Sequence, residues 1–290
     1  MIHHTFEACG TRWTLSIDAV SVSDEVFTFL ENETGIFESS FSRFIPESEV
    51  NAFRQVNAGT YDISPTLSLL LTQALRLQKM TKGGYNASIA TLFEKLGYDR
   101  EYRLREAPEH IDWTAPVWSV KGTKLTTTGP VVFDLGGIGK GFWVDALSKM
   151  LTKLGFSYHL VDGGGDMMGT SKQSGEGWSV ALEWPGRSEI MLGKVILHNQ
   201  GLAASDIFRR RWKGWNHLIH AKTLKPLTSV RGCIAVAPSA FLADQVTSVL
   251  AFVPEQLYKK TVGQLGGSYC VMRADETVYV GPHWPGELFV

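Results

Sequence analysis

The residues whose types and spacing best suit a chemical function lie in a glycine-rich segment that contains a lysine. The segment Asp134-Leu135-Gly136-Gly137-Ile138-Gly139-Lys140-Gly141 follows a short apolar run and precedes a helical pattern. Glycines let backbone N–H groups approach an anion closely, and the N-terminus of a helix adds partial positive charge. Lys140 brings a full charge to the same place, so the segment suits a phosphate or a pyrophosphate. The alternative is a pair of tight turns between packed elements.

Two familiar phosphate-binding motifs do not fit this segment. A Walker A motif needs Ser or Thr after its lysine, and Gly141 stands there; the dinucleotide fingerprint that begins at Gly163 would need glycine where Met168 stands. Carboxylates near this segment and near a second glycine loop, Gly163-Gly164-Gly165, could hold a hard cation or a ribose, or could simply form turns. They are Asp134, Asp145, Asp162 and Asp166.

A carboxylate and a hydroxyl share one face of a helix expected over residues 239–252. Asp244 and Ser248 are four residues apart, among small or apolar neighbours. Together they could supply two oxygen ligands to Mg²⁺, whose other positions take water or phosphate. The alternative, which the sequence favours equally, is a buried hydrogen bond.

Two histidines, His217 and His220, lie in an apolar stretch that precedes this helix in the sequence. If that stretch is extended, they point to opposite faces and do not chelate one metal ion together. A single histidine near a phosphate site is a natural general base, although an isolated histidine is more often a surface or hydrogen-bonded residue. The sequence contains neither Gly-x-Ser-x-Gly nor His-Glu-x-x-His.

Helical and extended patterns alternate along the chain. Helices are expected at 23–33, at 65–80 with Ser64 as N-cap and Pro65 in the first turn, at about 142–154 and at 239–252. The inward face of the third helix is predicted to carry Phe142, Ala146, Leu147, Met150, Leu151 and Leu154. Strands are expected at 13–17, 131–133, 158–161, 178–182, 194–197, 234–237, 269–273 and 277–281. Hairpin-length spacings in the second half favour an α+β fold with mixed, largely antiparallel sheets packed by helices.

Composition narrows the class of protein. The 290 residues include 28 Lys or Arg and 29 Asp or Glu, so general attraction to nucleic acid or to an anionic membrane is not expected. No stretch reaches the roughly 18 apolar residues of a membrane-spanning helix, so no membrane insertion is expected. Three distant cysteines and the lack of a signal peptide or lipobox predict a cytoplasmic protein. Glycine is locally enriched, with 12 of 29 between residues 129 and 177, as a cofactor-binding site would require.

Taken in order, six segments resemble those of the ApbE family, the FAD-dependent FMN transferases. The resemblance runs nearly end to end, and its most specific block is 134–141 with Asp145. The segments are Cys9-Gly10-Thr11, 41–51, Gly84-Tyr85-Asn86-Ala87-Ser88, 134–145, Val161-Asp162-Gly163-Gly164-Gly165-Asp166 and Ala243-Asp244 with Ser248. The resemblance implies one α+β domain over 1–290 that uses FAD as substrate with Mg²⁺, cleaves the FAD pyrophosphate and attaches FMN by a phosphoester to a Thr or Ser of an acceptor flavoprotein.

The resemblance also implies roles for individual residues. His217 would be the catalytic base that deprotonates the acceptor hydroxyl. The Gly137 carbonyl, Asp244 and Ser248 would ligate Mg²⁺. The residues that would contact FAD are Cys9, Phe44, Gly84, Tyr85, Asn86, Asp134, Lys140 and Leu218.

The chain departs from the family pattern at several positions. In the segment 217–224, the family has Asp, Pro and Gly where this chain has His220, Ala221 and Leu224. A glycine position often needs a positive φ, so a rebuilt loop is expected there. Asn86 replaces an Asp. The alternative function is therefore an FAD-binding protein or FAD pyrophosphatase of the same fold that has lost transferase activity; a purely structural α+β domain is a third.

Overall fold

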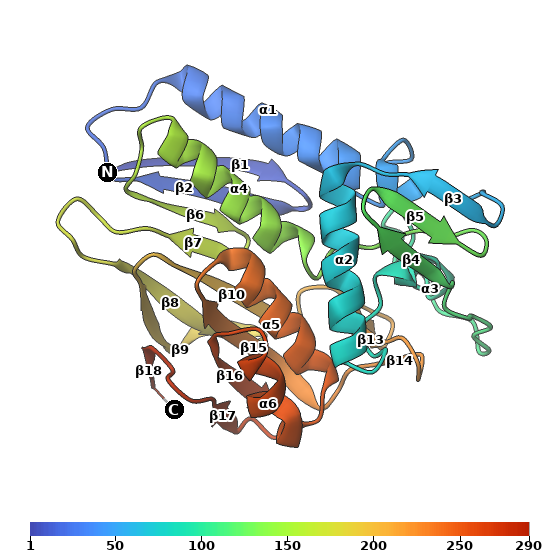
Figure 1. Cartoon of the computed structure of the whole chain (residues 1–290). Helices are drawn as coiled ribbons and strands as arrows, with labels where there is room; N and C mark the ends of the chain where they lie inside the picture. The colour runs from blue at the N-terminus through green and yellow to red at the C-terminus, as the bar shows by residue number, and fades with distance from the viewer. Residues whose placement is uncertain (290) are drawn as a thin grey trace. The chain divides into compact units, whose positions relative to one another are not determined.

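The computed structural model describes residues 1–289, which form two compact units (Figure 1). Unit 1 contains residues 1–36, 138–209 and 228 onward, and unit 2 contains residues 37–137 and 210–227. Each unit is therefore assembled from segments that are far apart in the sequence. No helix among residues 1–289 is long and apolar enough to cross a membrane.

Unit 1 is built on an eight-stranded sheet in the order β1-β2-β6-β7-β10-β15-β16-β17. Each neighbouring pair is antiparallel, as are all strand pairs in the described residues, and this confirms the α+β prediction. The strands are Ile2–Ala8, Thr11–Ile17, His159–Gly163, Met167–Gly169, Gln200–Asp206, Val230–Ala237, Ser268–Arg273 and Val278–Val280.

Helices cover one face of this sheet and a small second sheet packs on it through an apolar cluster. Helix α4 (Gly139–Lys153) packs on β6 and β7, and α5 (Ala240–Phe252) packs on β10, β15 and α4. The second sheet contains β8 (Trp178–Trp184), β9 (Arg187–Leu197) and β18 (Gly286–Leu288). Alternate residues of β8 enter the cluster with Leu202, Ile234 and Met272. Short helices η3 (Glu255–Leu257) and α6 (Tyr258–Gly263) precede β16.

The first helix, α1 (Asp24–Phe41), extends eight residues past the predicted end at 33. Gly35 lies inside the helix without interrupting it, and a side chain there would meet open space. Within unit 1, the buried Thr34 hydroxyl donates to the Leu30 carbonyl oxygen at 2.7 Å and accepts from the Trp143 indole N–H at 2.9 Å. Thr34 is therefore part of the buried face of α1. A prediction based on apolar residues alone overlooks it because its side chain is polar.

Helix α4 begins three residues earlier than predicted and presents a different face. Its buried large side chains are Trp143, Val144, Leu147 and Leu151, whereas Phe142, Ala146 and Met150 are half-buried and Leu154 is 43% exposed. Leu147 and Leu151 are therefore confirmed as inward, whereas the rest of the buried face lies about one residue away from the predicted positions. The early start makes Gly139, Lys140 and Gly141 part of the helix and not of the loop before it.

Unit 2 combines helix α2 (Pro65–Met80), a three-stranded sheet and short irregular elements. The Ser64 side chain accepts from the Leu67 N–H, which confirms the predicted N-cap. The sheet has the order β3-β5-β4 (Gly59–Asp62, Lys124–Thr127, Trp118–Lys121). The other elements are η1 (Glu49–Asn51), η2 (Ala87–Ile89), α3 (Ala90–Lys95) and the hairpins β11–β12 (Arg211–Trp212, Trp215–Asn216) and β13–β14 (Ile219–His220, Lys225–Pro226).

The predicted strand at 131–133 is not a strand. Its three residues are buried, but their N–H groups donate to single carbonyls, from Val131 to Phe53 and from Phe133 to Val50, and no ladder forms. The segment is apolar because it crosses the core of unit 2, and burial alone produced the strand-like pattern.

Candidate functional site

The N-terminus of α4 carries the lysine of the glycine-rich segment. The Lys140 ammonium forms an ion pair with the Asp166 carboxylate, whose side chain is 2% exposed. Asp166 ends the glycine loop that follows β6, so the structure joins the two loops that the sequence singled out in unit 1. The ammonium therefore stays beside the first turn of α4, where free backbone N–H groups favour an anion.

Asp244 on α5 lies within the same group of charges. Its carboxylate is buried and accepts the Gly141 N–H at 3.1 Å. Burial raises the pKa of Asp244 well above its usual range, the charge of Asp166 adds to this effect, and Lys140 opposes it. Without a side chain on Gly141 the helices can meet closely, because a Cβ there would lie 2.6 Å from the Ala240 carbonyl oxygen.

The residues around Asp244 fit a hard cation. Ser248 is one turn further along α5 and is 6% exposed, so a hydroxyl oxygen and a carboxylate share a buried face. A buried carboxylate is stabilised in its charged form by a neighbouring cation, and oxygen ligands are those that Mg²⁺ prefers. No group of three or more His, Cys, Asp or Glu side chains suited to a metal ion occurs in residues 1–289, so such a cation would rely on hydroxyl, carbonyl, water or substrate oxygens.

Two of the other carboxylates have structural roles. Asp145 accepts the N–H groups of Ala240 and Phe241 and thereby caps the helix that carries Asp244. Asp162 accepts the Gly165 N–H at 2.8 Å across the glycine loop. The turn-forming alternative is confirmed for Asp162, and burial raises the pKa of both carboxyls.

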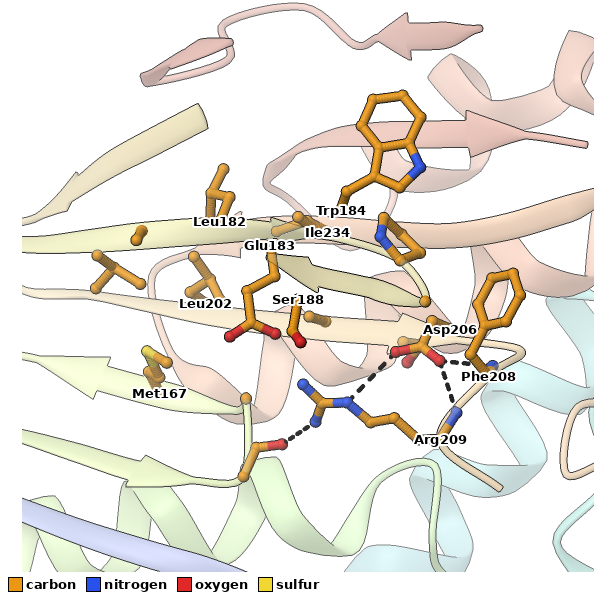
Figure 2. A pocket seen from close by; sticks show the side chains of 18 of the residues that line it. Met167, Leu182, Glu183, Trp184, Ser188, Leu202, Asp206, Phe208, Arg209 and Ile234 are labelled. Atoms are coloured by element: carbon orange, nitrogen blue, oxygen red, sulfur yellow. Dashed lines mark hydrogen bonds and ion pairs between the residues drawn. The ribbon is translucent and has the colours of Figure 1, made fainter. Parts of the chain in front are cut away.

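A cavity of about 620 Å³ lies in unit 1 beside the same glycine loop (Figure 2). Its walls include Thr11, Gly164 and Gly165 from two segments that resemble the family. Figure 2 shows apolar side chains such as Met167 and Leu202 apart from the charged pair formed by Asp206 and Arg209. A volume of this size, part apolar and part charged, suits part of a nucleotide-sized molecule.

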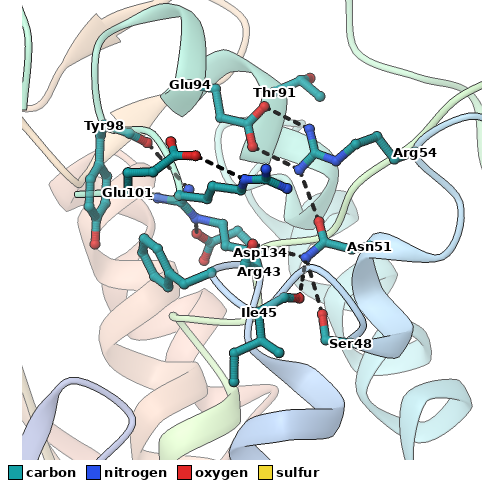
Figure 3. A network of polar contacts seen from close by, with 12 residues as sticks. Arg43, Ile45, Ser48, Asn51, Arg54, Thr91, Glu94, Tyr98, Glu101 and Asp134 are labelled. Carbon is teal, nitrogen blue, oxygen red and sulfur yellow. Dashed lines mark hydrogen bonds and ion pairs between the residues drawn. The ribbon is translucent and has the colours of Figure 1, made fainter. Parts of the chain in front are cut away.

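In unit 2, Asp134 is held by a residue that the sequence did not assign to the site. The Arg43 guanidinium is buried and pairs with the Asp134 carboxylate at 2.6 Å (Figure 3). It also stacks on the rings of Phe44 and Tyr98, at 4.2 and 4.4 Å from the ring centres. The other Asp134 oxygen accepts the Gly136 N–H at 2.8 Å. Arg43 thus anchors both Phe44 and the loop that leads to Gly137.

Replacing Arg43 by methionine is expected to destabilise unit 2 by about 3–5 kcal/mol, because it leaves a partly buried carboxylate without its cation. Adding Asp134→Asn should recover about 1 kcal/mol or more, since the amide oxygen can still accept the Gly136 N–H. Urea unfolding followed by tryptophan fluorescence measures both changes. The matched control is Arg54→Met, which breaks the more exposed Arg54–Glu94 pair and should lower stability less. Equal losses in the two single variants would contradict the anchoring role.

The predicted flavin segment and the predicted base also belong to unit 2. Gly84, Tyr85 and Asn86 are buried, and the Asn86 side chain accepts the Ser88 N–H to cap η2. The Gly84 carbonyl accepts the Ala221 N–H at 2.9 Å, so this segment is tied to the loop after β13. His217 and Leu218 are half-buried between β12 and β13.

The predicted residues therefore divide into two groups. Lys140, Asp244 and Ser248 come together in unit 1, where Cys9 lies in the turn between β1 and β2 with a φ of 53°. The group in unit 2 contains Phe44, Gly84, Tyr85, Asn86, Asp134, Gly137, His217 and Leu218. Asp166 and Arg43 were missing from the predicted set. Both lie inside segments that resemble the family, which was the available signal.

The loop that departs from the family pattern keeps a left-handed residue. Leu224 has a φ of 55°, in the region that glycine favours, and its N–H donates to the His220 carbonyl at 2.9 Å. Leu224 therefore adopts the positive φ that was expected to require rebuilding, so the rebuilding argument is wrong at this residue. The Leu224 side chain packs on the apolar cluster around Ile219 and Trp212, which offsets the strain.

Comparisons with known proteins place the chain in a family. Residues 9–271 match the ApbE family. The FAD:protein FMN transferase of Haemophilus influenzae is 28% identical over 238 residues, 75% of this chain and 67% of that protein. The protein of the same name from Escherichia coli K12 is 22% identical over 280 residues, 89% of this chain and 80% of that protein.

Solved structures agree on the fold. The flavin transferase ApbE from Vibrio cholerae superimposes with a TM-score of 0.82 at 18% identity, and the ApbE protein of Thermotoga maritima with a TM-score of 0.83 at 17% identity. In both comparisons 97% of each chain is covered. The family match spans most of the chain and includes all of the candidate site residues, so the chain belongs to the ApbE family.

Proposed function

We propose that this protein is an FAD:protein FMN transferase. The observation that carries the proposal is the group formed by Lys140, Asp166 and Asp244 at the N-terminus of α4, which combines an ammonium with buried oxygen ligands. A pyrophosphate needs this combination of positive charge and cation-binding oxygens. Family membership and the names of the relatives support the same reaction.

In the proposed reaction, the hydroxyl oxygen of a Thr or Ser in an acceptor flavoprotein bonds to the phosphorus of the FMN half of FAD. The bond from that phosphorus to the AMP phosphate breaks, and AMP leaves. The proton of the hydroxyl passes to a ring nitrogen of His217. Positioning and charge neutralisation supply most of the acceleration in such transfers.

Within this proposal, the residues of the chain have separable roles. Lys140, held by Asp166, attracts the pyrophosphate, and Arg43 keeps Phe44 and Asp134 in place for FAD. The remaining residues proposed to contact FAD are Cys9, Gly84, Tyr85, Asn86 and Leu218. The proposed transferase domain comprises residues 1–290, and the family match over residues 9–271 supports this extent.

Asp244, Ser248 and the Gly137 carbonyl are the proposed ligands of Mg²⁺. The buried position of Asp244, with its raised pKa, supports the need for a cation there. When bound, Mg²⁺ would neutralise charge on the pyrophosphate and on the departing AMP. A cytoplasmic location remains part of the proposal, and it rests on the three widely separated cysteines of the sequence.

The test is incubation of the purified chain with FAD, Mg²⁺ and a candidate acceptor, followed by mass spectrometry of the acceptor. Covalent FMN on a Thr or Ser, with one AMP released per adduct, is the expected result. AMP release without an adduct on cognate acceptors would favour an FAD pyrophosphatase. FAD binding without AMP release would favour the carrier alternative, to which the changed residues Asn86, His220 and Ala221 point.

A further inference from the structure

A lysine-lined cavity in unit 2 is unused by the proposed chemistry. It has a volume of about 400 Å³ and is lined by Leu75, Gln78, Lys79, Lys82, Gly83 and Lys222. Lys79 and Lys82 lie at the C-terminal end of α2, and Lys222 lies in the turn between β13 and β14 (Figure 1). We call these three exposed residues the lysine triad.

The triad carries positive charge that the described chain does not neutralise. None of the three ammonium groups has a carboxylate within 4.0 Å among residues 1–289. Residues 63–93 and 210–227, which include all the lining residues of the cavity and are flanked by Asp62 and Glu94, contain eight Lys or Arg and no Asp or Glu. In a chain with a net charge of −1, such a separation of charge creates a local positive field.

The backbone is shaped to hold Lys222 over the end of α2. Gly83 has a φ of 85°, and a Cβ there would lie only 2.8 Å from the Lys222 Cε. The absence of a side chain at Gly83 therefore lets the lysine stem cross the backbone. The Ala221–Gly84 hydrogen bond fixes the same two segments together. The Lys222 stem is thus held against the end of α2, and Lys79 and Lys82 line the same cavity.

The surroundings of the cavity favour a peptide over a simple anion. The side-chain oxygen of Gln78 is buried in the cavity wall and has no hydrogen-bond partner. It needs a donor, which a peptide N–H provides and which an unprotonated anion such as sulfate does not. The cavity also adjoins Gly84, which begins the proposed flavin segment, and the β13–β14 hairpin follows directly after His217.

We propose that the lysine triad binds an acidic segment of the acceptor flavoprotein and so brings the acceptor hydroxyl to the transfer site. The identity of the partner as an acceptor depends on the proposed function, whereas the binding of acidic peptide does not. Asp and Glu side chains of the acceptor pair with Lys79, Lys82 and Lys222, and a backbone N–H of the same segment donates to Gln78.

The triple variant Lys79→Gln, Lys82→Gln, Lys222→Gln tests both parts. Its matched control is Lys153→Gln, Lys259→Gln, Lys260→Gln, which removes the same charge from exposed lysines of unit 1. At low salt, fluorescein-labelled hexaglutamate should bind the wild type and the control, and about tenfold more weakly to the triad variant by fluorescence anisotropy. Equal binding by all three proteins, or displacement by inorganic phosphate at a lower concentration than by unlabelled hexaglutamate, would overturn the peptide site.

With an acceptor identified by the transfer assay, the triad variant should raise the KM for the acceptor about tenfold and change kcat less than about twofold. FAD affinity, measured by flavin fluorescence, should stay the same, and the salt dependence of KM should weaken. An unchanged KM together with normal transfer would overturn the docking role and leave the transferase intact. Hexaglutamate binding without transfer to any acceptor would reject the transferase and retain an acidic-peptide site.

Discussion

Replacing Asp244 by asparagine is expected to lower FMN transfer about a thousandfold while making the folded chain more stable. The amide keeps the shape of the side chain and an oxygen that can accept the Gly141 N–H, so α4 and α5 remain packed. It removes the buried negative charge that Mg²⁺ needs. The same change removes the desolvation penalty of a carboxylate beside Asp166, which should raise the free energy of unfolding by about 1–2 kcal/mol.

Transfer rates by mass spectrometry and urea unfolding without added metal measure the two effects. Thermal unfolding adds a readout that needs no activity, because Mg²⁺ should raise the Tm of the wild type and leave that of the variant unchanged. Asp275→Asn is the matched control, since Asp275 is an exposed turn residue whose pKa is lowered by hydrogen bonds from Thr277. It should gain no stability and lose no activity. A metal-dependent Tm shift that survives in Asp244→Asn would show that the cation binds elsewhere.

The loss of activity and the gain of stability expected for Asp244→Asn both depend on the burial of this residue. Asp244 therefore illustrates what the sequence can and cannot predict. The pairing of Asp244 with Ser248 follows from helical spacing, and the helix itself was predicted within one residue, with Ser239 as its cap. The source of its burial was not predictable. It comes from the close approach of α4 at Gly141, about one hundred residues earlier in the chain. Local periodicity predicts faces, whereas the contact between faces depends on the whole fold.

Glycine misled the prediction of the α4 boundary for the same reason. A run of glycines normally indicates a loop, and residues 136–141 were assigned to one. In the structure Gly139 and Gly141 are buried in the first turn of α4, and the missing side chain of Gly141 permits packing against α5. Glycine thus has two uses, turn formation and close approach, which only the neighbouring element distinguishes.

The ion pairs of the site show most clearly what local sequence patterns cannot predict. Lys140 and Asp166 are 26 residues apart, and Arg43 and Asp134 are 91 residues apart. Nothing in the spacing of these residues pairs them. The α+β class, the four longest helices and seven of the strands could be predicted because each depends on local patterns. The partners that hold Lys140 and Asp134 could not. Arg43 and Asp166, the two best buried of these charges, were accordingly missed.

Replacing His217 by asparagine is expected to lower FMN transfer about 10²–10⁴-fold, the usual contribution of a general base. FAD affinity should stay within about twofold, since the proposed role of His217 concerns the acceptor hydroxyl and not the flavin. Because histidine changes charge between about pH 5 and 8, the fall in the wild-type rate at acidic pH should disappear in the variant. Single-turnover transfer measured across this pH range gives the loss of rate and its pH dependence. A separate binding measurement gives the FAD affinity.

The best control is His220→Asn, three residues away in the same half-buried segment. His220 pairs with Lys225 in the β13–β14 ladder, and its Nδ1 accepts the Thr223 N–H at 3.4 Å, so it has a structural partner within its own turn. Transfer should change less than about threefold in this variant, because no proton transfer is assigned to it. A large loss in His220→Asn with little loss in His217→Asn would assign the base to position 220, where the family has Asp. Equal losses of FAD affinity in both variants would instead mean that this segment binds flavin, which would favour the alternative of a chain that retains FAD binding without transfer.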